Sequence, residues 1–331
     1  MKLTLIPVFL LLTTGCHTGS ADPEEITNPD PGWTISGHLE PGTFIHTLAA
    51  TDGNNYIFTS GTRVTIVEAS QPKNYQAASE VLAMAVDPAD GSLWLGTSAS
   101  GLAHLHSAQF RYFSAESHGL PRNCVSDVAV TPRGAVWFSS SAHKLGGLCC
   151  LENGQVSLFT PENSLLPDNL VKSIALCGEL VFVVTGGTVD QQKVVQISGG
   201  NWSSLPVQGY YLMAAQADKK GTLYVIDDVS LSSSMAMNPK IWKFNGTGAV
   251  NILPLLDRFQ YTPAGLITDH RNYLWVSGFA GETSKTLMVY DGEKWHEGPA
   301  DFPELVIRSL AVDRSNTLWL GTDNGIYLLK Q

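Results

Sequence analysis

Short apolar runs separated by turn residues recur along most of the chain. The last example is "IRSLAVDRSNTLWLGTDNGIYLL" (307–329), in which apolar runs at 309–312, around Trp319 and at 325–329 are separated by polar turns. Runs of four to six residues rich in Val, Leu and aromatic side chains, with Asp, Asn and Gly between them, are typical of β-strands joined by tight turns. The pattern therefore predicts an all-β protein.

The same unit recurs, and its second run carries an aromatic residue each time. Related segments lie at 44–67, 81–105, 125–151, 171–197, 211–244 and 264–290. The aromatic residues at the matching position are Phe58, Trp94, Trp137, Phe182, Tyr224, Trp275 and Trp319. Their spacing, from 36 residues between Phe58 and Trp94 to 51 between Tyr224 and Trp275, brackets the period of β-propeller blades. The repeat predicts a seven-bladed β-propeller over residues 32–331.

Each blade needs a fourth strand, and several units supply one after the third run. Fourth runs lie at 109–115, 154–160, 200–206 and 292–298. The last unit has no such run, but "DPGWTISGHL" (30–39) resembles the fourth runs and aligns Trp33 with Trp202 and Trp295. We therefore expect four-stranded antiparallel blades, with the ring closed by the N-terminal strand pairing with the C-terminal blade, which removes an open sheet edge.

The recurring aromatic residues are expected to form the core between blades. Blade sheets twist and pack face to face, and large apolar rings fill the space between them. One such ring in each unit is what this packing requires, so these tryptophans are not interpreted as a cofactor site.

The first 15 residues, "MKLTLIPVFLLLTTG", resemble a bacterial lipoprotein signal peptide followed by Cys16. In that family the peptide is cut before the cysteine, which is then lipidated; here Thr13 stands where a Leu is usual. The alternative is a simple secretory signal with an incidental cysteine. Residues 16–31, polar and proline-bearing, are expected to be a flexible tether. The resemblance implies a lipid-anchored protein of the bacterial cell envelope, at the outer membrane or cell surface rather than the inner membrane.

Charge argues against a nucleic-acid partner, and hydropathy argues against an internal transmembrane helix. The net charge is −10 and the pI about 5.3, so a nucleic-acid partner is not expected, because an acidic surface repels phosphate backbones. No apolar run of about 20 residues follows the N-terminus, so no internal transmembrane helix is expected.

Four further cysteines, Cys124, Cys149, Cys150 and Cys177, would meet an oxidising compartment after export, where disulfides persist. The adjacent pair at 149–150 would point to opposite faces of one strand, so only one of its members would easily reach a given neighbour. We expect one structural disulfide or none, and the pairing stays open.

The segments "SLAVDRSNTLWLGTDNGIYLL" (309–329), "HGLPRNCVSDVAV" (118–130) and "SLLPDNLVKSIAL" (164–176) resemble the two-component regulator propeller repeat. The resemblance covers about residues 33 to 330. It implies the seven-bladed fold and, in that family, an extracellular sensor of membrane histidine kinases; here it would be a stand-alone lipoprotein. The Trp-bearing repeats are also similar to those of streptogramin lyase, which is an enzyme, so the fold does not decide the function.

Ligands of propellers usually meet the mouth of the central channel, where the innermost strands begin. Two sets of loops should line it: those entering each first strand and those joining second to third strands. The candidate ligand-binding residues in them are Tyr210, Tyr211, His118, Arg122, Asp168, Tyr261, His143, Asp227 and Glu304. The adjacent tyrosines are the preferred spot, because tyrosine joins a broad ring to a polar tip. Alternatively, at least one of them packs into the neighbouring blade.

Catalytic motifs are not found: there is no GxSxG, HExxH or P-loop. Asp227 and Asp228 are adjacent and would diverge in an extended segment, which argues against a catalytic pair. We predict no catalytic residue, cofactor or metal. The interpretation is a monomeric, membrane-anchored, non-enzymatic binding or sensor module that recognises a glycan, peptide or partner protein at the channel mouth. The alternative is a periplasmic lyase or hydrolase with a funnel-bound active site that could use a metal.

Overall fold

The structure is a computed structural model. It describes residues 33–330 apart from 52–54, 143–144, 188–191, 208, 210, 228–238, 254–260, 281–286, 300 and 304. The predicted signal segment (1–15) and the whole of the predicted tether (16–31) lie outside the described residues.

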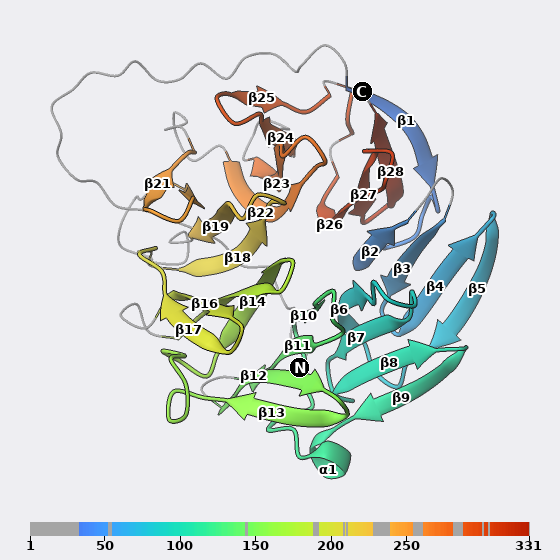
Figure 1. Cartoon of the computed structure of the whole chain (residues 1–331). Coiled ribbons are helices and arrows are strands. Elements are labelled where there is room, and N and C mark those ends of the chain that lie inside the picture. The colour runs from blue at the N-terminus through green and yellow to red at the C-terminus, as the bar shows by residue number, and fades with distance from the viewer. Residues whose placement is uncertain are drawn as a thin grey trace, which may run out of the picture.

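Seven four-stranded antiparallel sheets stand in a ring, which confirms the predicted seven-bladed β-propeller (Figure 1). Within each blade the strands pair in chain order, except in the last. The first strands lie innermost, and each contacts the first strand of the next blade all the way round. These inner strands surround the central channel.

The first four blades comprise the strands that follow. Blade 1 is β2 (Thr47–Ala50), β3 (Tyr56–Ser60), β4 (Arg63–Glu68) and β5 (Gln71–Gln76); blade 2 is β6 (Val81–Val86), β7 (Leu93–Thr97), β8 (Leu102–His106) and β9 (Gln109–Phe113). Blade 3 is β10 (Val128–Val130), β11 (Val136–Ala142), β12 (Leu145–Glu152) and β13 (Gln155–Phe159); blade 4 is β14 (Val171–Cys177), β15 (Leu180–Thr185), β16 (Val194–Ser198) and β17 (Asn201–Ser204). One short helix, α1 (Ala115–His118), follows β9 in the described part of the chain.

The remaining blades follow the same order. Blade 5 is β18 (Leu212–Ala217), β19 (Leu223–Asp227), β20 (Lys240–Phe244) and β21 (Ala249–Asn251); blade 6 is β22 (Tyr261–Thr268), β23 (Leu274–Ala280), β24 (Leu287–Tyr290) and β25 (Trp295–Glu297). Blade 7 is β26 (Ile307–Val312), β27 (Leu318–Thr322), β28 (Gly325–Lys330) and β1 (Thr34–Leu39).

The ring is closed as predicted, by the N-terminal strand. β1 pairs antiparallel with β28, from Thr34 opposite Lys330 to Leu39 opposite Ile326, and the two lie side by side in blue and red in Figure 1. The strand begins at Thr34, and residues 30–32 of the predicted segment lie outside the described residues. Pairing of the two chain ends leaves no open gap between the first and last blades.

A packing rule governs the aromatic residues between blades. Trp94, Trp275 and Trp319, on second strands, each pack onto the blade that follows, whereas Trp33, beside a fourth strand, packs onto the blade that precedes it. The predicted equivalence of Phe58 with the second-strand tryptophans is wrong by one residue. Phe58 packs with Trp319 of blade 7, and Ile57 is the residue that faces blade 2. In the register of β2 and β3, Phe58 lies opposite Leu48 and Ile57 opposite Ala49, and successive side chains of a strand point to opposite faces.

Aspartates in the turns between first and second strands hold these tryptophans. Asp313 accepts hydrogen bonds from the N–H groups of Ser315 (2.9 Å) and Thr317 (2.8 Å) and from the indole Nε1 of Trp319 (3.0 Å). One carboxylate thus organises both the turn and the core ring, since a short acidic side chain bonds readily to N–H groups just ahead of it.

The four cysteines in the described residues are free thiols. Cys149 and Cys150 are buried on β12, and burial raises the pKa of each thiol to about 12. A thiol this hard to deprotonate is a poor nucleophile, so both serve as packing groups.

Candidate functional site

The innermost strands carry β-bulges at the end of the central channel where each strand begins. The register shifts lie between Val81 and Ala83, Val171 and Ser173, Leu212 and Ala215, Pro263 and Gly265, and Ile307 and Ser309. A bulge leaves its extra residue unpaired and redirects that side chain, and such bulges often lie beside binding sites. In five of the seven blades, an inner-strand residue is therefore re-aimed at the channel mouth.

Two of the bulged residues are cationic, and the first is Arg308 of blade 7. Its guanidinium carbon lies 5.1 Å from the ring centroid of Phe44, which precedes blade 1. Phe44 is 41% exposed, and Arg308 is exposed as well. A large ring and a charge held together in contact with water form an arrangement suited to binding.

His46 and Glu80 extend this sector toward blade 2. Nδ1 of His46 lies 3.7 Å from Oε1 of Glu80, and its ring meets Phe44 edge on at 6.2 Å. Burial lowers the pKa of His46; Glu80 opposes the shift and Arg308 adds to it. The imidazole therefore favours its neutral form at neutral pH.

The second cation, Lys172 of blade 4, lies in a different sector. Its Nζ donates a weak hydrogen bond to the sulfur of Met213, one of the two residues in the bulge of blade 5, at 3.4 Å, and lies 5.4 Å from the ring centroid of Tyr211. The bulged residues of two neighbouring blades thus meet at the mouth. Tyr211, one of the two preferred predicted residues, is half-buried beside them.

Asp227, predicted as a ligand contact, lies behind that surface. The side chain is 1% exposed, and its oxygens accept hydrogen bonds from the backbone N–H of Tyr211 (3.0 Å) and the indole of Trp242 (3.0 Å). Lys240 lies opposite it in register, and burial lowers the pKa of this lysine while Asp227 opposes the shift. Asp227 therefore positions Tyr211 and is too deeply buried to touch a ligand.

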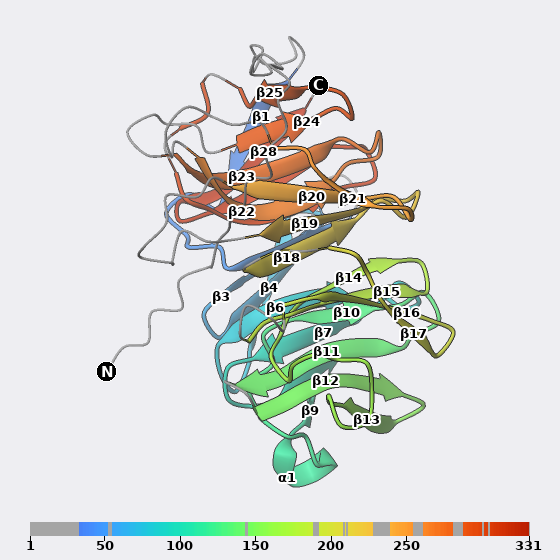
Figure 2. The same ribbon diagram turned by 90° about the vertical axis from the view of Figure 1, so that its left-hand side faces the viewer.

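Three other predicted residues make local contacts. His118 ends α1, and its ring lies tilted against that of Phe113 of β9, with centroids 4.5 Å apart; both views place α1 at the outer edge of the ring (Figures 1 and 2). The expectation that its loop lines the channel is wrong there, because the link starts at the outermost strand. Arg122 bonds through its backbone to Ser140 of β11, and Asp168 is 6% exposed and accepts from a nearby backbone N–H.

Four predicted residues lie outside the described part of the chain: Cys16, His143, Tyr210 and Glu304. Tyr261 begins β22, but its side chain is not among those described. Their roles stay predictions.

The sequence reasoning missed Arg308 and Lys172. The sequence does mark these two residues: in "VIRSLAV" (306–312) and "LVKSIAL" (170–176) a lone cation interrupts an apolar inner strand at the same position of the repeat. A charged side chain is costly to bury, so a lone cation in an apolar inner strand indicates a position that reaches water.

Metal-binding clusters and membrane-spanning helices are absent from the described residues. No group of three or more His, Cys, Asp or Glu side chains there is placed to hold a metal ion. No helix in that part of the chain has the length and apolar character to cross a membrane.

One segment of the chain matches a known protein family. Residues 301–324, which lead into and include β26 and β27, match the family described as two component regulator propeller. The chain carries a two component regulator propeller repeat. This confirms the resemblance read from the sequence, and the seven blades show the architecture that the repeat implies. A search of curated proteins finds no significant match.

Solved structures share the fold at low sequence identity. Virginiamycin B lyase from Staphylococcus aureus has a TM-score of 0.69 at 11% identity, covering 90% of this chain and 99% of that one. The extracellular domain of a putative hybrid two component system from Bacteroides thetaiotaomicron has a TM-score of 0.65 at 13% identity, with 90% and 42% coverage. PorZ of Porphyromonas gingivalis, a surface component of the type-IX secretion system, has a TM-score of 0.63 at 15% identity, covering 87% of this chain and 46% of that one.

Proposed function

We propose that this protein is a non-enzymatic binding or sensor module of the bacterial cell envelope, held to a membrane through Cys16. It recognises a glycan, peptide or partner protein at the channel mouth. The observation that carries this proposal is the exposed pair of Phe44 and Arg308, supplied by two blades and aimed by a bulge. An exposed ring beside an exposed guanidinium offers apolar area and directed hydrogen bonds to a partner.

The ligand brings an anionic group, such as a carboxylate. Arg308 and Lys172 lie in different sectors of the mouth, each against an aromatic ring. They stand out on a chain whose net charge is −10, so they act locally and not through the overall field. A guanidinium binds a carboxylate through two parallel hydrogen bonds, which fixes the ligand's orientation.

Two of the neighbours with this fold are named as extracellular or surface components, which supports an envelope location. Lipid anchoring rests on the segment "TTGC" (13–16) and the apolar run before it. Mass spectrometry of protein made in a bacterial host would test it, since an acylated Cys16 gains the mass of its lipid and a Cys16→Ser variant does not.

Binding is tested on arrays of acidic peptides and of oligosaccharides with uronic acids, probed with the full chain. Hits are measured by surface plasmon resonance for the wild type, Arg308→Gln and Lys172→Gln. Each substitution should weaken binding about tenfold, since a hydrogen bond to a charged group contributes roughly 1.5–3 kcal/mol. Lys294→Gln, in an exposed turn between β24 and β25, is the matched control. Equal affinities for all four proteins would refute the role of the mouth.

An enzymatic role is the second candidate, and the lyase fold among the neighbours is the observation that keeps it. At 11% identity that likeness extends to the fold and not to the activity. If array hits are converted to products at a rate lost in the Arg308 variant, the protein is an enzyme and the binding-only proposal fails.

A further inference from the structure

A groove of about 520 Å³ opens between blades 3 and 4. Its lining includes the turns at 131–135 and 152–155, which join strands at the end of the ring opposite the channel mouth. Trp137, Phe159 and Trp202 form an aromatic row along it, with centroids 5.7 Å and 5.1 Å apart. All three are only half-buried, which departs from the expectation that Trp137 would be enclosed in the core.

The interface between blades 6 and 7 shows the same arrangement in a closed form. Trp275 is the counterpart of Trp137. In the strand register Ile35 matches Trp202, but Trp33, two residues earlier on the same face, supplies the indole at this interface and meets Trp275 edge on at 4.4 Å. Tyr273 precedes Trp275 by two residues and so shares its face of the strand. Arg271 lies over the rings of both Tyr273 and Trp33, at 4.5 and 4.9 Å.

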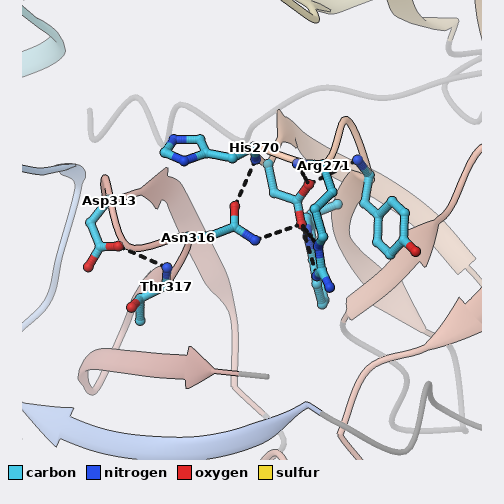
Figure 3. Close-up of polar contacts among 8 residues, drawn as sticks. His270, Arg271, Asp313, Asn316 and Thr317 are labelled. Atoms are coloured by element: carbon cyan, nitrogen blue, oxygen red, sulfur yellow. Dashed lines mark hydrogen bonds and ion pairs between the residues drawn. The ribbon is translucent and has the colours of Figure 1, made fainter.

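A carboxylate completes the closed interface. Asp269 pairs with the guanidinium of Arg271 at 3.2 Å and accepts the indole N–H of Trp275 at 3.4 Å. Figure 3 shows Asn316 of blade 7 beside His270 and Arg271 of blade 6, where its Oδ1 accepts the backbone N–H of His270 at 2.7 Å. Blades 6 and 7 are thus joined by an acid, a cation and three rings.

Blade 3 keeps part of this set and lacks the rest. In the turn "TPRGA" (131–135), Arg133 corresponds to Arg271, but Thr131 stands where blade 6 has Asp269, and Ala135 where it has Tyr273. Within the described residues the guanidinium of Arg133 and the indole N–H of Trp137 make no hydrogen bond. The groove is the space that a phenol ring and an acidic oxygen fill in blade 6.

The turn between the first two strands of blade 4 is also shorter than its counterpart in blade 7. It is only Gly178 and Glu179, since Cys177 already pairs with Leu180, whereas blade 7 has a longer turn that carries Asn316. Oε1 of Glu179 accepts a hydrogen bond from the backbone N–H of Arg133 at 2.9 Å, which joins blades 3 and 4. Trp137 nevertheless stays half-exposed.

The charges at the groove select against a full anion. Arg133, Glu152 and Glu179 are the charged residues that line it, and together they carry one net negative charge. An incoming carboxylate would meet two glutamates, whereas a neutral oxygen would still accept from Arg133 and Trp137.

We propose that this groove is a binding site for a neutral aromatic ring that bears an oxygen, the phenol class. The ring takes the place that Tyr273 fills in blade 6, against the guanidinium of Arg133. Its oxygen accepts from Trp137 or Arg133. The ring comes from a small phenolic compound or from a tyrosine side chain of a peptide, and the groove is large enough for a ring with flanking groups.

Isothermal titration of the full chain with p-cresol and with N-acetyl-L-tyrosinamide tests the proposal. Both probes are expected to bind with millimolar or better affinity, and N-acetyl-L-phenylalaninamide several-fold more weakly because it lacks the oxygen. Tighter binding of the tyrosine amide identifies a peptide as the source of the ring, and equal or tighter binding of p-cresol identifies a small phenol. Failure of both to bind, or tighter binding of benzoate or methyl glucoside, would overturn it.

Ala135→Tyr rebuilds the closed interface from within and should reduce binding at least tenfold, with an unchanged circular dichroism spectrum. Should that variant not fold, Arg133→Gln, at an exposed position, is expected to weaken binding several-fold. Binding that survives both substitutions at full strength would overturn the proposal. Arg308→Gln, at the opposite end of the ring, should leave phenol binding unchanged, so this site stands or falls separately from the channel mouth.

Discussion

Trp33 meets Trp275 edge to face, with ring centroids 4.4 Å apart, and so joins the start of the described chain to blade 6. Trp33 is 6% exposed and Trp275 fully enclosed. Trp33 precedes β1, and its indole inserts into the interface between blades 6 and 7. Closure of the ring therefore rests on side-chain packing as well as on strand pairing.

Replacing Trp33 by Ala should destabilise the whole ring. Loss of a buried indole typically costs about 3–5 kcal/mol, because the apolar contact is lost and a cavity remains. Urea unfolding followed by tryptophan fluorescence measures the change. Trp202→Ala is the matched control: it removes an indole that also faces the preceding blade, from the fourth strand of blade 4, but one that is half-exposed over the groove, with an expected cost of about half. Similar losses in the two variants would contradict the packing argument.

Asp127 should make stability depend on pH. Its Oδ2 accepts the backbone N–H of Ile174 at 2.7 Å, across the boundary between blades 3 and 4, and its Oδ1 accepts that of Val128 at 2.9 Å. Desolvation raises the pKa of this carboxyl to about 6, and the hydrogen bonds only partly offset it. The folded state therefore holds the proton more tightly than the unfolded chain.

The free energy of unfolding that Asp127 contributes is then greatest below about pH 4, falls as the pH rises toward about 6, and is level above that. Asp127→Asn carries no titrating group. The difference in unfolding free energy between wild type and variant, measured in urea at half-unit steps from pH 4 to 7.5, should decline and then flatten. A constant difference, or one that grows with pH, would show that the carboxyl is not desolvated.

Gly101 should tolerate no side chain. Its φ is +81°, and a Cβ there would overlap the backbone carbonyl of Phe113. Gly101→Ala is expected to cost about 3 kcal/mol or more, from strain plus displaced backbone. Gly91 has a similar φ of +75° but open space around the site, so Gly91→Ala should cost about 1 kcal/mol. Thermal unfolding of the pair separates the clash from the backbone strain, and equal losses would rule out the clash.

The buried thiols should resist alkylation. At pH 8 iodoacetamide needs the thiolate, and a pKa near 12 leaves Cys149 and Cys150 almost fully protonated. Peptide mass spectrometry should find both unmodified in the native protein and both modified in 8 M urea. Cys177, which is half-buried, supplies the native comparison. Modification of Cys149 at the same rate as Cys177 would mean that blade 3 opens readily.

The candidate sites were only partly predictable, and the reasons are physical. The channel mouth follows from the repeat, since any loop entering an inner strand must reach it. His118 shows the limit: the link to the next blade crosses the full width of the ring, and only the structure shows which part of it lies inside. Asp227 was singled out as polar and in a loop region, yet pairing with Lys240 buries it.

The sequence alone determined the seven blades, their four strands and the closure by residues near Trp33, because spacing and alternation of apolar residues are local properties repeated along the chain. The tertiary structure alone decided which side chains meet. Bulges aim Arg308 and Lys172 at the mouth, and the exchange of an aspartate and a tyrosine for Thr131 and Ala135 opens a groove at one interface. Both effects depend on contacts between blades, which no single repeat contains.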